Sequence, residues 1–155
     1  QWVFDGDRML MYYDGRPYEH GRPDAKGMLA GDGCESSVGI GVAASPIDRF
    51  AGLKPLDAAR PGCVVVALPE RTQSLALNCQ VPDGSEITAS LRYPDGCRVL
   101  THTDETCRPI RQGGLRVPVE WNERALPQDL GPLHLRVCLK GAPVIHALYP
   151  HAKAE

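Results

Sequence analysis

The sequence predicts an all-β protein, and three observations support this class. The 155-residue chain contains 14 Pro and 16 Gly, residues that interrupt helices. No window of about eleven residues free of Pro and Gly places apolar side chains at the helical spacing i, i+3, i+4 and i+7. Short segments of alternating apolar and polar residues recur instead, separated by turn signals such as the PDG sequences at 82–84 and 94–96.

The first part of the chain, residues 1–60, is expected to form one small sheet. Residues 8–13 (RMLMYY) are apolar enough for a strand buried on both faces, and residues 36–44 are the next expected strand. We also expect an edge strand over residues 49–56, after a turn at Pro46. Three or four strands make one sheet with no second layer to cover it, as in a single propeller blade. The sequence therefore predicts a propeller-blade-like antiparallel sheet.

Beyond residue 60 the strands become regular, and residues 61–155 are predicted to form a β-sandwich of jelly-roll or Ig-like build. Leu75, Leu77 and Cys79 alternate with smaller or polar residues and would share one face of a strand. Antiparallel sandwiches show such alternation, with turns about every 8–12 residues. The six expected strands carry the sequences CVVVAL, SLALNCQV, EITASLRY, GLRVPVEW, LHLRVCL and PVIHALY.

The charge distribution argues against two classes of partner. The formal net charge is −2, and the 17 Lys and Arg residues are scattered, so we expect no nucleic-acid partner. No apolar segment approaches the ~20 residues of a membrane helix, and we expect no membrane partner. The opening residues QWVFDGDRML do not resemble a signal peptide, and their strand-like character favours a fragment of a longer chain. The sequence does not indicate a cellular compartment, and a secreted parent protein is compatible with it.

The six cysteines leave three states open: buried free thiols, disulfides and metal ligands. Their number is below the ~8–10% that marks a disulfide scaffold, and no C-x-x-C pair occurs. Cys97 and Cys107 flank one short connection and are the pair we expect if a disulfide forms. Cys79 shares the apolar face of its strand, whereas Cys138 is opposite in phase to Leu135. We therefore expect Cys79 to be buried and Cys138 to lie on the opposite face.

Several motifs, in this order, resemble one family. The segments DGDRMLMYYDG and SVGIGVAASPIDRFAGLKPL, joined by a loop that holds Glu19-His20-Gly21, look like the last blade of a five-bladed β-propeller glycoside hydrolase related to families 32 and 43. In such proteins the second segment leads into a C-terminal β-sandwich. The later motifs that continue the resemblance are LALN (75–78), YPDG (93–96), TCRPI (106–110), VPVEW (117–121) and GPLHLR (131–136).

The resemblance implies a role without catalysis for this chain. In the family the catalytic carboxylates stand on earlier blades, which this chain does not contain, so no catalytic residue is assigned. The chain is then the C-terminal accessory part of a glycan-hydrolysing protein, with the upstream blades of its own propeller as partner and carbohydrate as an optional contact. The alternative is a free-standing carbohydrate-binding or structural β-sandwich module with no catalytic activity.

The long loop after the first strand, residues 14–35, holds the candidate substrate-binding residues. By resemblance this loop approaches the propeller axis, where an acid or His20 would meet a substrate. An aromatic face and paired guanidinium donors in the same loop suit a sugar. A solvated polar loop is the simpler explanation of these residues, and both interpretations stay open. The candidates are Asp14, Tyr18, Glu19, His20 and Arg22.

Signatures of other chemistries do not occur in the sequence. It contains no G-x-S-x-G, H-E-x-x-H or G-x-x-x-x-G-K-[ST] motif. The short GDG (31–33) and GIG (39–41) segments lack the following helix of a phosphate-binding loop. We expect no cofactor and no metal. Trp121 is expected in the sandwich core rather than at the surface as a platform for sugars.

Overall fold

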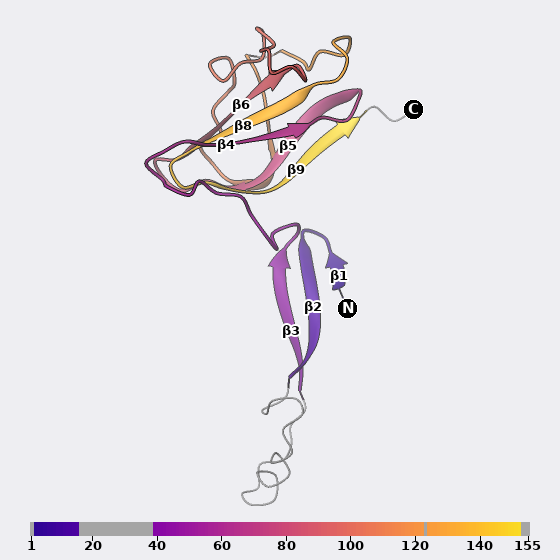
Figure 1. Cartoon of the computed structure of the whole chain (residues 1–155). Coiled ribbons are helices and arrows are strands. Elements are labelled where there is room, and N and C mark those ends of the chain that lie inside the picture. Colours follow the sequence, from indigo (N-terminus) through magenta and orange to yellow (C-terminus); the bar gives the residue numbers. More distant parts are fainter. Residues whose placement is uncertain (1, 16–38, 123, 153–155) are drawn as a thin grey trace, which may run out of the picture. The chain divides into compact units, whose positions relative to one another are not determined.

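In the computed structural model, the described residues contain nine strands, which form three antiparallel sheets (Figure 1). The structure describes residues 2–15, 39–122 and 124–152, and no helix occurs among them. The all-β class is therefore confirmed. No helix of the described residues is long and apolar enough to cross a membrane. The chain divides into two compact units, residues 1–47 and 48–155, and each is described by itself.

The first unit contains one three-stranded sheet in the order β1-β2-β3. A tight turn joins the first two strands, and Gly6 in this turn adopts a φ of 55°, which glycine tolerates best. The strands expected over 8–13 and 36–44 correspond to β2 and β3. The strands are β1 (Trp2–Asp5), β2 (Arg8–Gly15) and β3 (Gly39–Pro46).

Both faces of this sheet expose apolar side chains. Tyr12 and Tyr13 are successive residues of β2 and point to opposite faces, and they are 45% and 50% exposed. The ring of Tyr13 lies over Gly41, its cross-strand partner, where any Cβ atom would overlap the ring. Met9 is the one buried apolar side chain among the described residues of this unit. Strand β2, which was expected to be buried on both faces, therefore has exposed side chains on both faces.

The second unit contains two three-stranded antiparallel sheets, in the orders β4-β8-β6 and β7-β5-β9. All six strands expected from the alternating pattern are present, with ends shifted by a few residues. Their bounds are β4 (Gly62–Ala67), β5 (Thr72–Gln80), β6 (Glu86–Arg92), β7 (Gly114–Pro118), β8 (His134–Lys140) and β9 (Val144–Ala152).

One hydrophobic core is shared by these two sheets. Leu77 of β5 and Leu135 of β8 are completely buried in it. Cys79 is also fully buried, whereas Cys138 on the opposite face of β8 is only half-buried, as the phase of the two strands predicts. Alternation therefore separated the inner from the outer face of β8 correctly, whereas β5 is buried on both faces from Leu75 to Cys79.

The segment after the first unit differs from the prediction. The expected division lay at residues 60 and 61, but contacts place residues 48–60 with the second unit. The edge strand expected over residues 49–56 is wrong: a single bridge forms, in which Leu53 and Ile145 exchange hydrogen bonds of 2.8 and 2.9 Å. Pro55 lies two residues further along the chain, and it has no N–H that could continue the ladder of hydrogen bonds.

Candidate functional site

The sequence-predicted substrate site falls mainly outside the described residues. Tyr18, Glu19, His20 and Arg22 all lie there. Only the backbone of Asp14 is described, in β2 opposite Ile40 of β3. The described structure therefore neither gathers nor separates these five candidates.

A groove of about 920 Å³ is the candidate site that the described residues do provide. It lies beside two connecting segments of the second unit, residues 105–109 and 119–126. Its lining includes the buried apolar side chains of Val119 and Leu126. The charged side chains that also line it are called its rim here: Glu105, Arg108, Glu120 and Arg124. Small-molecule sites combine apolar lining with a few polar groups in this way.

Trp121 lies under this groove as a core residue. Its side chain is only 1% exposed, and its Nε1–H donates a 2.8 Å hydrogen bond to the carbonyl oxygen of Ala89. The ring of His102 meets it edge-on, with ring centroids 5.2 Å apart. The prediction that Trp121 belongs to the core is confirmed, and this indole offers no open face on which a sugar would stack.

His102 supports the same part of the core. It is 3% exposed, its Nε2 lies 3.0 Å from the carbonyl oxygen of Ala125, and its Nδ1 lies 2.9 Å from the hydroxyl of Thr101. A carbonyl only accepts, so Nε2 carries the proton and Nδ1 accepts from Thr101. Burial lowers the pKa of His102, which favours this neutral form.

The rim pairs a guanidinium with a carboxylate. Nη1 of Arg108 lies 3.3 Å from Oε2 of Glu120, and the backbone N–H of Arg108 donates to the carbonyl oxygen of Glu120 at 2.8 Å. The backbone contact fixes the two positions, while the side chains stay solvated at 80% and 50% exposure. Such a pair offers donors and acceptors that suit the hydroxyl groups of a polyol. The motifs TCRPI and VPVEW contain these two residues, but neither motif predicted that they pair, because the two positions are twelve residues apart.

One acid of this groove, Glu105, does not suit glycoside hydrolysis. A glycosidase needs a general acid with a raised pKa opposite a second carboxylate. Glu105 on the rim has its pKa lowered, mainly by a hydrogen bond from Thr103, which is the wrong direction for that acid. Glu105 therefore does not fit the role of that general acid. Among the described residues, no group of three or more metal-ligating side chains lies together.

A second cluster fixes the segment that opens the second unit. Oδ2 of Asp48 accepts a 2.6 Å hydrogen bond from the hydroxyl of Tyr149, and Arg116 lies over the same ring at 4.1 Å. Nε of Arg49 donates to Oδ1 of Asn78 at 2.9 Å. The carbonyl oxygen of Ala51 lies 2.8 Å from Nδ1 of His146. Side chains and backbone thus tie residues 48–51 to strands β5 and β9.

Comparisons with known proteins do not identify the chain: no family model, no curated protein and no solved structure matches it.

Proposed function

We propose that this chain is the C-terminal accessory part of a glycan-hydrolysing β-propeller protein. In this proposal the first unit adds a blade-like sheet to the propeller, and the second unit is a β-sandwich that braces it. The observation that carries the proposal is the exposure of Tyr12 and Tyr13 on opposite faces of one sheet.

Soluble sheets normally cover at least one face with a second layer. The sheet of the first unit leaves large apolar side chains exposed on both faces, with Phe4 at 65% and Ile40 at 81% in addition to the two tyrosines. A propeller blade has a neighbouring blade on each face, which is the arrangement that would cover both. The occupant of these faces is therefore taken to be the upstream blades of the same protein.

The contact between two resemblance motifs is a second support. The IDRF segment (47–50) and the LALN strand (75–78) are far apart in the sequence, and they meet through Arg49 and Asn78. A brace must fix the chain that leaves the propeller. The hydrogen bonds of Asp48, Arg49 and Ala51 to the second unit provide such a fixation.

Hydrogen exchange on this chain and on the full-length parent protein tests the proposal. We expect the amides of β2 and β3 to exchange fast in this chain and to gain protection in the parent, because neighbouring blades would cover them. The upstream coding sequence should contain four further strand repeats of the Tyr-Tyr-x-Gly type. An unrelated upstream domain, or unchanged exchange of β2 and β3, would contradict the proposal.

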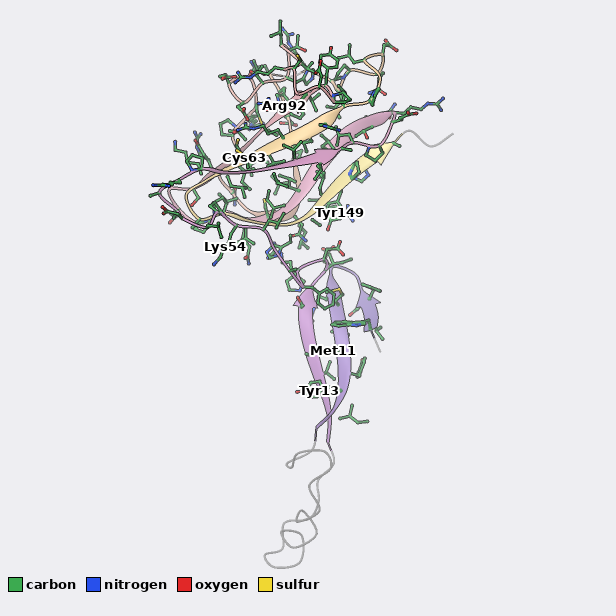
Figure 2. The ribbon with its side chains drawn as sticks, in the orientation of Figure 1. Met11, Tyr13, Lys54, Cys63, Arg92 and Tyr149 are labelled. Atoms are coloured by element: carbon green, nitrogen blue, oxygen red, sulfur yellow. The ribbon has the colours of Figure 1, made fainter. Side chains whose placement is uncertain are left out.

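The same proposal assigns substrate contact to the loop candidates of the first unit. In the parent enzyme, His20→Ala and Arg22→Ala should raise KM for the glycan, since they would remove polar contacts with substrate. Lys54→Ala is a matched control, because Lys54 is an exposed side chain of the second unit (Figure 2). Unchanged kinetics in both loop variants would remove the loop from the proposal.

A free-standing carbohydrate-binding module is the second candidate, and the groove beside Arg108 and Glu120 favours it. Affinity electrophoresis in gels that contain soluble polysaccharides tests it. Retardation of the wild type that is lost in the Arg108→Ala/Glu120→Gln double variant would support binding there. Arg60→Ala is the control, because Arg60 is highly exposed and lies outside the groove. Free migration on every polysaccharide would rule the groove out.

A further inference from the structure

Two cysteines face each other on neighbouring strands of the second unit. Cys63 lies on β4 (Figure 2), and its register partner in β8 is Cys138. Their Sγ atoms are 2.7 Å apart. This is far inside the ordinary contact distance of sulfur and only somewhat longer than the ~2.05 Å of a disulfide bond.

The backbone permits a bond between these two sulfurs. Directly opposed residues of antiparallel strands have Cα atoms ~4.5 or ~5.5 Å apart, depending on their hydrogen-bonding class. Both separations fall within the ~4.4–6.8 Å that disulfides span. No backbone movement is therefore needed to join Cys63 to Cys138.

A polar network holds the pair on the outer face of the sheet. Nη2 of Arg136 lies 2.9 Å from Sγ of Cys63, and its Nη1 lies 2.9 Å from Oδ2 of Asp104. The hydroxyls of Thr88 and Ser90 donate to the two oxygens of the same carboxylate, at 3.4 and 3.3 Å. Arg136 is thus fixed from one side by Asp104 and presents its other nitrogen to the sulfur.

The other described cysteines are not placed for such a bond. Cys79 and Cys107 are buried, and Cys97 is exposed in a turn. The pairing of Cys97 with Cys107 that the sequence suggested is not formed: both thiols are free. Sγ of Cys107 instead accepts a 3.3 Å hydrogen bond from the backbone N–H of Ala89.

We propose that Cys63 and Cys138 are a redox-active dithiol, which low-molecular-weight disulfides oxidise to a cross-strand disulfide between β4 and β8. Cys63 loses its proton to solvent, and its thiolate attacks one sulfur of the external disulfide, releasing one thiolate that takes up a proton. Cys138 then loses its proton and attacks the Cys63 sulfur of the mixed disulfide, displacing the second small thiolate. Two protein thiols are oxidised, and one external disulfide is reduced to two thiols.

The surroundings assign the two roles. Cys63 is exposed, so it is the thiol that an external disulfide reaches first. Cys138 is half-buried, and burial together with its hydrogen bond to Cys63 raises its pKa to about 12. Cys138 is therefore the resolving thiol, which becomes a useful nucleophile when the mixed disulfide lies against it. The product would pin the edge strand β4 to the centre of its sheet and close a loop between positions 75 apart.

The test compares the reduced chain with the chain incubated in oxidised glutathione at neutral pH. We expect the loss of two thiols and a Cys63–Cys138 cross-linked peptide in a non-reducing digest. The oxidised chain should melt higher by on the order of 10 °C, because a bond across a long loop restricts the unfolded chain. A reductant should reverse both changes.

Serine variants supply the controls. Cys63→Ser and Cys138→Ser should each abolish the cross-link and the shift in melting temperature, while Cys97→Ser, which removes the other exposed thiol among the described residues, should behave as the wild type. Three results would overturn the proposal. They are a stable glutathione adduct on Cys63 without a cross-link, a cross-link that involves another cysteine, and no loss of thiols.

Discussion

Nε of Arg49 donates a 2.9 Å hydrogen bond to Oδ1 of Asn78, an amide that is completely buried in the middle of β5. The two residues are 29 positions apart. The contact explains why an Asp-Arg-Phe segment follows the first unit: the charged donor satisfies a buried acceptor, and it fixes the chain that enters the second unit.

Arg49→Ala should therefore lower the free energy of unfolding by about 1–3 kcal/mol, since it leaves the buried oxygen of Asn78 without this donor. Urea unfolding followed by the fluorescence of Trp121, in a Trp2→Phe background, measures the change. Arg60→Ala is the matched control, because Arg60 is exposed and its ion pair at 3.8 Å is with exposed Asp57, so this variant should change stability by less than about 0.5 kcal/mol. Equal effects of the two variants would contradict a structural role for the Arg49–Asn78 contact.

Asp48 combines a backbone and a side-chain role. Its φ is 57°, a left-handed conformation that Asn and Asp tolerate better than Ala, and its carboxylate accepts from Tyr149. Asp48→Asn keeps both features and should cost less than about 0.5 kcal/mol, whereas Asp48→Ala loses both and should cost about 2 kcal/mol. Tyr149→Phe removes only the hydrogen bond and should fall between them. The order is read from urea midpoints, and an Asn variant as damaged as the Ala variant would refute it.

The sequence was most informative where a strand has one buried face. Alternation predicted all six strands of the second unit and the opposite faces of Cys79 and Cys138, because period two follows directly from strand geometry. It did not predict the pairing of Cys63 with Cys138, since the register between β4 and β8 depends on long connections that leave no local pattern. For the same reason, the sequence did not predict the contact between Arg108 and Glu120. Residues 49–56 were misjudged because their strand-like composition carries no information on pairing: only Leu53 bridges to Ile145 of β9, and Phe50, Leu53 and Leu56 are exposed.

The two units should differ in protection from hydrogen exchange. The described part of the first unit buries one apolar side chain, Met9, whereas the second unit has a continuous core. Amides of β2 and β3 should therefore exchange at least about tenfold faster than those of β5 and β8. Exchange followed by mass spectrometry at neutral pH measures this. Equal protection would mean that the first unit is stabilised to the same degree as the core of the second unit.

His102 should make the second unit sensitive to acid. Burial, the main cause, lowers its pKa in the folded chain, so the unfolded chain binds a proton at higher pH than the folded one does. The stability that neutral His102 contributes is then fully present above the unfolded pKa of ~6.5. It is lost as pH falls below that value, by at most about 1.4 kcal/mol per pH unit. His102→Gln should be less stable at pH 7 but show a flatter dependence between pH ~6.5 and ~5.5. His151→Gln, at an exposed position, should keep the wild-type slope, and an unchanged slope in His102→Gln would exclude this residue as the cause.

The order in which two thiols react tests the assignment of inner and outer faces. Cys79 is completely buried, and burial is the main cause that raises its pKa, while Cys138 is half-buried on the outer face of β8. Because both thiols have raised pKa values, access decides the rate, and alkylation should modify Cys138 before Cys79. The measurement uses a Cys63→Ser background under reducing conditions, so that no disulfide competes. Labelling of Cys138 should vary little with low concentrations of urea, whereas labelling of Cys79 should rise steeply with urea, because it requires opening of the core. The reverse order would show that the buried and exposed faces of these strands are exchanged.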